Sequence, residues 1–100
     1  MRVFLNPGHD LERDSGALNH TRGLRECDVA ADIGERVKGY LDEAGCEVQL
    51  IQSDNLNGET PELPCVVGSA NGWPADVFVS LHCNAADGSV RGTESIVWAG

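Results

Sequence analysis

The sequence has no long hydrophobic run and few basic residues, and these two absences exclude several classes of protein. No apolar stretch among its 100 residues approaches the roughly 20 residues that a transmembrane helix requires, so we expect no membrane partner. Seven lysines and arginines stand against 16 aspartates and glutamates, which gives a formal net charge of -9. This charge opposes binding to phosphate backbones, so we do not expect nucleic acid as a partner.

Paired cysteines are also missing from the chain. Cys27, Cys46, Cys65 and Cys83 include no CxxC pair, and their even spacing matches no zinc-binding motif. The chain is also too poor in cysteine for a disulfide-stabilised scaffold. We therefore expect four free thiols.

The hydrophobic pattern in the first half of the chain predicts a strand followed by a helix. Apolar residues 3–5 form a short buried strand, which the Asn-Pro-Gly turn at residues 6–8 ends. Residues 26–44 repeat apolar side chains at helical spacing, and Gly45 favours the end of that helix. The expected apolar face consists of Val29, Ile33, Val37, Tyr40 and Leu41. Residues 6–25 form a connection far longer than usual, which suggests a function for this loop.

The second half of the chain predicts three more strands and one more helix. Residues 47–51 have the composition of a strand, residues 53–64 that of a loop, and residues 65–72 that of a short helix. Residues 76–83 form a β-rich run typical of a central strand covered on both faces, and residues 93–99 form a last strand. This order favours a layered α/β fold with a mostly parallel sheet flanked by helices.

Two histidines and a glutamate are expected at one edge of this sheet. His9 follows the first strand, His82 ends the strand of residues 76–83, and Glu26 begins the long helix. Each residue alone has an ordinary structural explanation, such as an acid that stabilises a helix dipole or a histidine that bonds a loop carbonyl. Their joint position at the carboxyl ends of parallel strands favours a metal site. This ligand set suits zinc with a fourth position open for water, as catalytic zinc requires.

Other kinds of site fit the sequence less well. Residues 10–14 alternate acids as in a calcium-binding loop, but the glycine and the bidentate acid of that loop are missing. Ser80 and His82 share one face of a strand without meeting, and the chain has no nucleophile elbow. The turn at residues 6–10 lacks the glycines and the lysine of a phosphate-binding loop.

At these residues the chain resembles the zinc-dependent N-acetylmuramoyl-L-alanine amidases. The resemblance rests on VFLNPGHD, on GLRECDVAADIGERVKGYLDEAGCEV, and on SANGWPADVFVSLHCNA with RGTES, which follow one another along nearly the whole chain. It implies hydrolysis of the amide between the muramic acid lactyl group and the first L-alanine of the peptidoglycan stem peptide. It also implies zinc held by His9, Glu26 and His82.

Three features depart from the family pattern. Asp10 stands where the family usually has glycine, and Val67 or a neighbour stands where an arginine often precedes the Ala-Asn pair. The family also has a general-base glutamate late in its domain. The resemblance therefore implies that residues 1–100 are the N-terminal portion of a single amidase catalytic domain and that the catalytic base lies beyond Gly100. Glu94 is interpreted as a structural residue of the last strand.

Substrate contacts are expected from the long loop and from the last histidine motif. Arg22 and Arg25 lie in the loop that should border the cleft, where a guanidinium can bind carboxylates, and Asn84 belongs to the motif SLHCN. The expected partner is peptidoglycan or a muropeptide. The alternative function is a non-catalytic module that binds zinc or muropeptide without the catalytic glutamate.

The charge and the N-terminus add expectations about location. A negatively charged chain is not drawn to an anionic wall, so a separate cell-wall-binding domain is an expected partner. Met1 and Arg2 lead directly into the first strand without a signal peptide. This pattern predicts a phage lysin or a cropped mature domain that acts at the bacterial cell wall or outside the cell.

Overall fold

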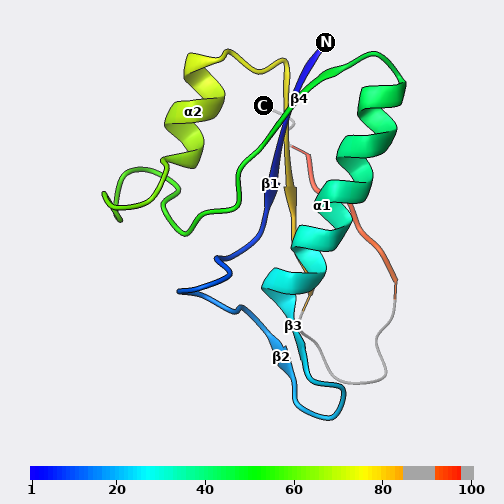
Figure 1. The fold of residues 1–100 in the computed structure, drawn as a ribbon, viewed down its shortest axis with the longest axis vertical. Helices are drawn as coiled ribbons and strands as arrows, with labels where there is room; N and C mark the ends of the chain where they lie inside the picture. The colour runs from blue at the N-terminus through cyan, green and yellow to red at the C-terminus, as the bar shows by residue number, and fades with distance from the viewer. Residues whose placement is uncertain (85–91, 98–100) are drawn as a thin grey trace.

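The core of the fold is a three-stranded parallel sheet with the first strand at its centre. The computed structural model describes residues 1–84 and 92–97. Strands β1 (Arg2–Pro7), β4 (Glu47–Leu50) and β5 (Val77–Leu81) pair in the order β4-β1-β5, and both pairings are parallel (Figure 1). The structure therefore confirms the expected α/β fold with a mostly parallel sheet.

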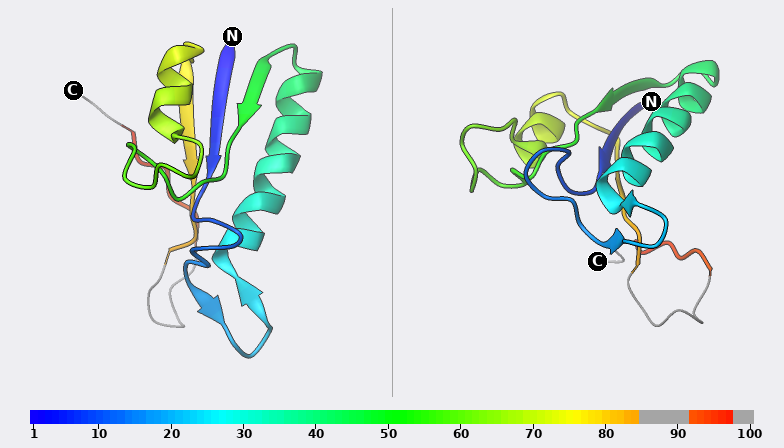
Figure 2. Two further views of the ribbon diagram at one scale, coloured as in Figure 1. Left: turned by 60° about the vertical axis from the view of Figure 1, so that its left-hand side comes forward. Right: turned by 60° about the horizontal axis from the view of Figure 1, so that its bottom comes forward.

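Two helices cover the opposite faces of this sheet. Helix α1 (Glu26–Glu43) packs against β1 and β4, and helix α2 (Val66–Gly72) lies on the other side of the strands (Figure 2). Phe4 of β1 forms a buried cluster with Val66 and Ala70 of α2. Because a parallel sheet is covered on both faces, its central strand must be apolar, which explains why β1 is buried along most of its length.

Helix α1 contacts the sheet through small residues. Ala30 and Gly34 are buried, and a Cβ atom on Gly34 would lie 2.7 Å from Cγ of Pro7. The apolar face predicted from the sequence is therefore partly wrong, because Ile33 is 42% exposed and Tyr40 is 75% exposed. Large apolar side chains defined the predicted face, whereas close packing on β1 requires small ones.

Most of the predicted boundaries agree with the structure to within one or two residues. Strand β1 continues through Pro7, beyond the predicted end of the strand. Helix α1 ends at Glu43 and is followed by Gly45, which has a φ of 87° and so adopts the left-handed conformation that commonly ends helices. Strand β4 and helix α2 lie within the predicted segments 47–51 and 65–72.

Two predictions for the C-terminal part of the chain are wrong. Strand β5, expected at the sheet centre, is an edge strand among the described residues, and its Val77 and Phe78 are 39% and 45% exposed. An apolar run does not by itself distinguish a central strand from an edge strand. Residues 93–97 of the predicted last strand, which include Glu94, form no strand, and residues 98 and 99 lie outside the described part of the chain.

The long segment after β1 contains a hairpin that the sequence did not predict. Strands β2 (Leu18–Asn19) and β3 (Leu24–Arg25) pair in antiparallel fashion, and they are too short for a period-two pattern to be visible. The first two backbone N–H groups of α1 donate to the carbonyl oxygens of Ala17 and Ser15, at 2.8 and 3.0 Å. This segment therefore caps the N-terminus of α1, whose N–H groups have no partner within the helix.

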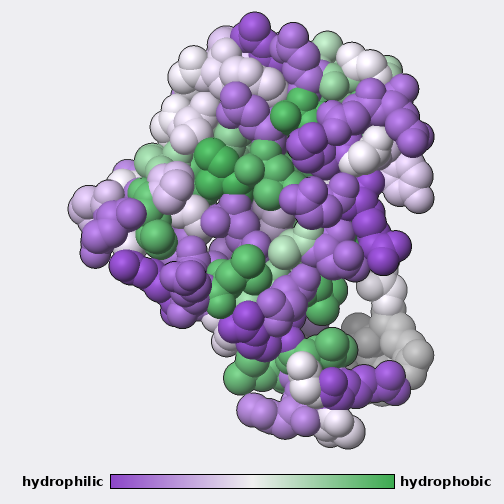
Figure 3. All heavy atoms as spheres, viewed as in Figure 1, coloured by the Kyte–Doolittle hydropathy of each residue, from purple (hydrophilic) through white to green (hydrophobic). Residues whose placement is uncertain are grey.

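The surface combines hydrophilic side chains with exposed hydrophobic ones such as Leu18, Tyr40 and Phe78. On the face shown in Figure 3, hydrophobic side chains form separate patches among hydrophilic ones. None of the described helices is long and apolar enough to cross a membrane. All four cysteines are free, with Cys27 buried and Cys83 exposed.

Candidate metal centre

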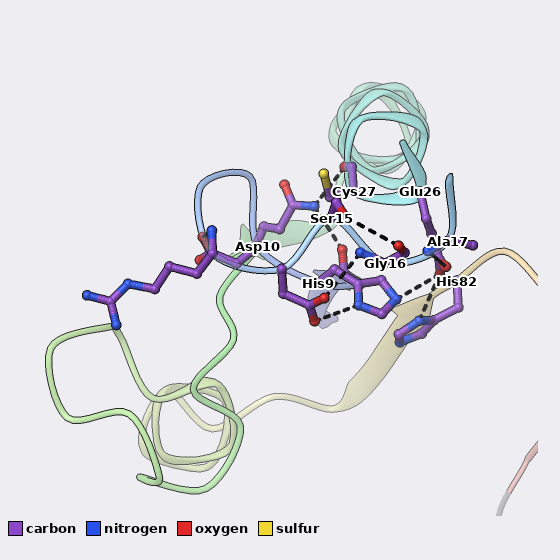
Figure 4. A network of polar contacts seen from close by, with 12 residues as sticks. His9, Asp10, Ser15, Gly16, Ala17, Glu26, Cys27 and His82 are labelled. Carbon is purple, nitrogen blue, oxygen red and sulfur yellow. Dashed lines mark hydrogen bonds and ion pairs between the residues drawn. The ribbon is translucent and has the colours of Figure 1, made fainter. Parts of the chain in front are cut away.

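Three side chains with metal-ligating atoms meet at the carboxyl-terminal edge of the sheet (Figure 4). Nε2 of His9 lies 3.0 Å from Oε2 of Glu26, and Nδ1 of His82 lies 3.2 Å from the same oxygen. One possible ligand atom from each residue lies within 4.8 Å of the other two. The structure thus brings together the three residues that the sequence analysis proposed as ligands.

The pairing of β1 with β5 places the two histidines side by side. Pro7 and Leu81 are register partners, and the backbone N–H of Gly8 donates to the carbonyl oxygen of Leu81 at 2.8 Å. His9 and His82 therefore leave the sheet together, and their ring centroids are 5.1 Å apart. A Cβ atom at Gly8 would lie 2.5 Å from Cε1 of His82, so this close approach requires glycine.

His9 is held in an unusual backbone conformation. Its φ of 67° lies in the left-handed region, which residues other than glycine rarely adopt. Such strain persists only where the surrounding structure enforces it, and it is frequent at functional sites. The ring packs against the backbone of Gly16, where a Cβ atom would lie 2.5 Å from Cδ2 of His9.

Asp14 orients the ring of His9. Oδ2 of Asp14 lies 2.8 Å from Nδ1 of His9, so a proton on Nδ1 leaves the lone pair of Nε2 directed at the centre. The hydrogen bond to Asp14 is the largest cause that raises the pKa of His9 above its usual value. The same bond to His9 lowers the pKa of Asp14. This role of Asp14 was not predicted from the sequence, because no spacing rule connects an acid in an irregular loop to a histidine five residues earlier.

Glu26 is buried and remains a carboxylate. Its side chain is only 6% exposed, and it accepts the backbone N–H groups of Ala17 at 3.2 Å and of Cys83 at 2.9 Å. Burial raises the pKa of Glu26, but these two N–H groups and the histidines outweigh it, so the net pKa is lowered. Glu26 therefore joins the segments that contain Ala17 and Cys83. Among the described residues, His82 bonds Glu26 rather than a loop carbonyl.

A cavity of about 340 Å³ adjoins the two histidines of this group. Its wall includes His9, Asp14, Asp54, Phe78 and His82. Asp54 belongs to the loop predicted at residues 53–64, and the sequence suggested no role for it. The pKa of its carboxyl group is raised by burial and by the negative charge of Asp14. The cavity therefore combines the metal-ligating atoms with carboxyl groups and an apolar surface.

The three residues expected to contact substrate lie outside the lining of this cavity. The guanidinium of Arg25 donates to both carboxylate oxygens of Asp28, at 2.7 and 2.9 Å. Arg22 is exposed in the hairpin, and among the described residues its guanidinium forms no ion pair. Nδ2 of Asn84 donates to Oε1 of Glu94 at 2.5 Å.

The chain is similar to known amidases along nearly its whole length. Residues 3–99 match the family model Amidase_3, described as N-acetylmuramoyl-L-alanine amidase. The chain is 37% identical to N-acetylmuramoyl-L-alanine amidase LytC of Bacillus subtilis (strain 168), over 87% of this chain and 16% of LytC. It is 38% identical to the uncharacterized protein YqiI of the same organism, over 93% of this chain and 42% of YqiI.

A solved structure agrees with these sequence similarities. N-acetylmuramoyl-L-alanine amidase AmiC2 of Nostoc punctiforme superposes with a TM-score of 0.69 and 34% identity, over 88% of this chain and 46% of AmiC2. The chain thus spans less than half the length of each of these three relatives. Since the family model covers residues 3–99 and the fold agrees, the protein belongs to the N-acetylmuramoyl-L-alanine amidase family.

Proposed function

We propose that the protein is a zinc-dependent amidase that hydrolyses the bond between the muramic acid lactyl group and the L-alanine of the peptidoglycan stem peptide. The observation that carries this proposal is the meeting of His9, Glu26 and His82 beside a cavity. Two imidazoles and one carboxylate are a donor set of catalytic zinc sites, which keep one coordination position open.

The distances between the donor atoms support zinc. Zinc bonds nitrogen and oxygen ligands at about 2.0–2.2 Å, so tetrahedral coordination separates two ligand atoms by roughly 3.3–3.5 Å. Oε2 of Glu26 lies 3.0 and 3.2 Å from the two histidine nitrogens, which is close to this separation.

The residues of this chain would perform three tasks in the reaction. Asp14 keeps Nδ1 of His9 protonated, and the N–H groups of Ala17 and Cys83 keep Glu26 ionised and fixed. The cavity holds the scissile amide beside them. A bound zinc ion supplies Lewis-acid chemistry, which activates water and polarises the amide carbonyl.

Departure of the amine also requires a proton from a general acid. The family resemblance assigns the general-base glutamate to a position beyond Gly100. The described cavity wall includes the carboxyl groups of Asp14 and Asp54. The pKa of Asp14 is lowered and that of Asp54 is raised, so Asp54 is the more readily protonated of the two.

The contacts with substrate are part of the same proposal. Arg22 is the stronger of the two arginine candidates, because its guanidinium is exposed whereas that of Arg25 is bonded to Asp28. Asn84 follows His82 by two residues and lies at the same edge of the sheet. Peptidoglycan as the partner and the cell wall as the place of action follow from the proposed reaction.

Mass spectrometry of peptidoglycan incubated with the zinc-loaded protein tests this proposal. An amidase releases stem peptides with a new L-alanine amino terminus, and Glu26→Gln should abolish this release. Retention of the protein on peptidoglycan without release would favour the alternative, a zinc- or muropeptide-binding module. A protein that is not retained on peptidoglycan and releases no stem peptides would contradict both functions.

A further inference from the structure

The side chain of Gln52 connects the two backbone segments that carry His9 and Glu26. Its Nε2 donates to the carbonyl oxygen of Gly8 at 2.9 Å and to the carbonyl oxygen of Cys27 at 2.8 Å. Gly8 immediately precedes His9, and Cys27 immediately follows Glu26. One carboxamide therefore links the loop after β1 to the first turn of α1.

Gln52 is suited to this link by its chemistry and its position. A carboxamide nitrogen carries two hydrogens, which is one for each carbonyl oxygen. Gln52 lies two residues after the end of β4, next to Ile51, whose N–H donates to the carbonyl oxygen of Leu5 at 3.0 Å. The sheet therefore fixes the backbone from which the side chain of Gln52 reaches the two segments.

The contacts form a closed ring through the metal centre. Gln52 bonds Gly8 and Cys27, the chain continues to His9 and Glu26, and Nε2 of His9 meets Oε2 of Glu26 at 3.0 Å. Without the carboxamide, two part-buried carbonyl oxygens would lose a donor, and the two segments would be free to move apart.

We propose that Gln52 is a positioning residue of the metal centre, which fixes the distance between the ligand atoms of His9 and Glu26. This inference rests on the proposed function, because it assumes that these two residues bind the metal. Metal affinity depends on ligands that are held in place before the ion binds, and loss of such supporting contacts typically weakens binding about 10–100-fold.

The first test compares Gln52→Met with the wild-type protein. Methionine is similar in length but has no N–H donor. Competition with a chromophoric chelator should show zinc binding weakened about 10-fold or more. The absorption bands of bound cobalt(II) should also change, which a loss of overall stability alone does not cause. Equal zinc affinity and an equal cobalt spectrum in the two proteins would overturn the proposal.

Gln49→Met is the matched control. Gln49 is half-buried in β4, and among the described residues its side chain forms no hydrogen bond. This variant should bind zinc as the wild-type protein does, and weakening equal to that in Gln52→Met would contradict a specific role for Gln52. If Gln52→Met does not fold, Gln52→Asn takes its place, because the shorter side chain cannot reach both carbonyl oxygens.

Hydrogen exchange in the metal-free protein separates this inference from the proposed function. The backbone N–H groups of Gly8 and Cys27 are bonded to the carbonyl oxygens of Leu81 and Ser15. Both should exchange faster in Gln52→Met than in the wild-type and Gln49→Met proteins. Unchanged exchange at both sites would overturn the role of Gln52 even if the wild-type protein binds zinc. A wild-type protein that binds no zinc would overturn the proposed function, and faster exchange in Gln52→Met would then show only that Gln52 joins the two segments.

Discussion

Nδ1 of His9 lies 2.8 Å from Oδ2 of Asp14, and this contact determines which ring nitrogen faces Glu26. An ionised carboxylate only accepts hydrogen bonds, so the ring donates the Nδ1 proton to Asp14. Nε2 is then free to bind a cation. The carboxylate also makes the imidazole a stronger base and hence a stronger ligand.

Replacement of Asp14 should therefore weaken metal binding. We expect Asp14→Asn to lower zinc affinity by about 10–100-fold, because the amide does not hold the ring in one tautomer. Isothermal titration of the metal-free protein with zinc measures the change. Asp32→Asn removes the same charge from an exposed ion pair on α1 and should have no effect. An equal loss of zinc affinity in Asp14→Asn and Asp32→Asn would show that zinc binding depends only on the net charge of the protein.

The same contact predicts how the stability of the metal-free protein depends on pH. Because the folded state raises the pKa of His9 above 6.5, protonated His9 stabilises the fold below about pH 6.5. This stabilisation is lost as the pH rises through the raised pKa. The free energy of unfolding of the wild-type protein should therefore exceed that of Asp14→Asn by less at pH 8 than at pH 6. Urea unfolding in a chelator measures both values, and a constant or growing difference would contradict the prediction.

Gly16 should be essential to the placement of His9. A Cβ atom at Gly16 would lie 2.5 Å from the His9 ring, whereas one at Gly23 meets nothing within 4 Å. Their φ angles are nearly equal, at 68° and 65°, so alanine strains the backbone alike at both positions, by roughly 1–2 kcal/mol. Gly16→Ala should lose zinc affinity in a chelator competition, and Gly23→Ala should keep it. Similar affinities in both variants would exclude the steric explanation.

Gly34 and Gly39 provide a similar comparison for the packing of α1. A Cβ atom on Gly34 would lie 2.7 Å from Pro7, and one on Gly39 would meet nothing within 4 Å. Alanine favours a helix over glycine by about 1 kcal/mol, so Gly39→Ala should stabilise the protein. Gly34→Ala should be less stable than Gly39→Ala by about 1–3 kcal/mol, because it overpacks the helix against the sheet. Urea unfolding measures the free energy of unfolding of both variants. Equal values would show that α1 can shift away from the sheet without loss of stability.

The sequence was sufficient to place His9, Glu26 and His82 at one edge of the sheet. Their positions follow from rules that do not depend on side-chain detail: parallel strands end at the same edge, and the following helix begins there. The short apolar runs and the period of α1 were visible in the sequence. The fold class and the meeting of these three residues were therefore predictable.

The supporting contacts were not predictable, because they depend on the path of irregular segments. The side chains that support the centre or line its cavity come from loops, and they belong to Asp14, Gln52 and Asp54. In a loop, no periodicity relates the position of a residue in the sequence to the direction in which its side chain points. The buried face of α1 was misjudged for a different reason. Hydrophobic periodicity gives weight to large residues such as Tyr40, whereas the contact surface uses Gly34.

The central claim is that His9, Glu26 and His82 bind one zinc ion, and titration of the metal-free protein with zinc tests it most directly. The chain offers its own control, because His20 is exposed in the hairpin and lies outside the group of possible ligands. We predict one zinc ion per chain in the wild-type protein and in His20→Ala, and a loss of zinc affinity of at least about 100-fold in His82→Ala. Absence of zinc binding in the wild-type protein, or equal affinity in His82→Ala, would contradict this claim.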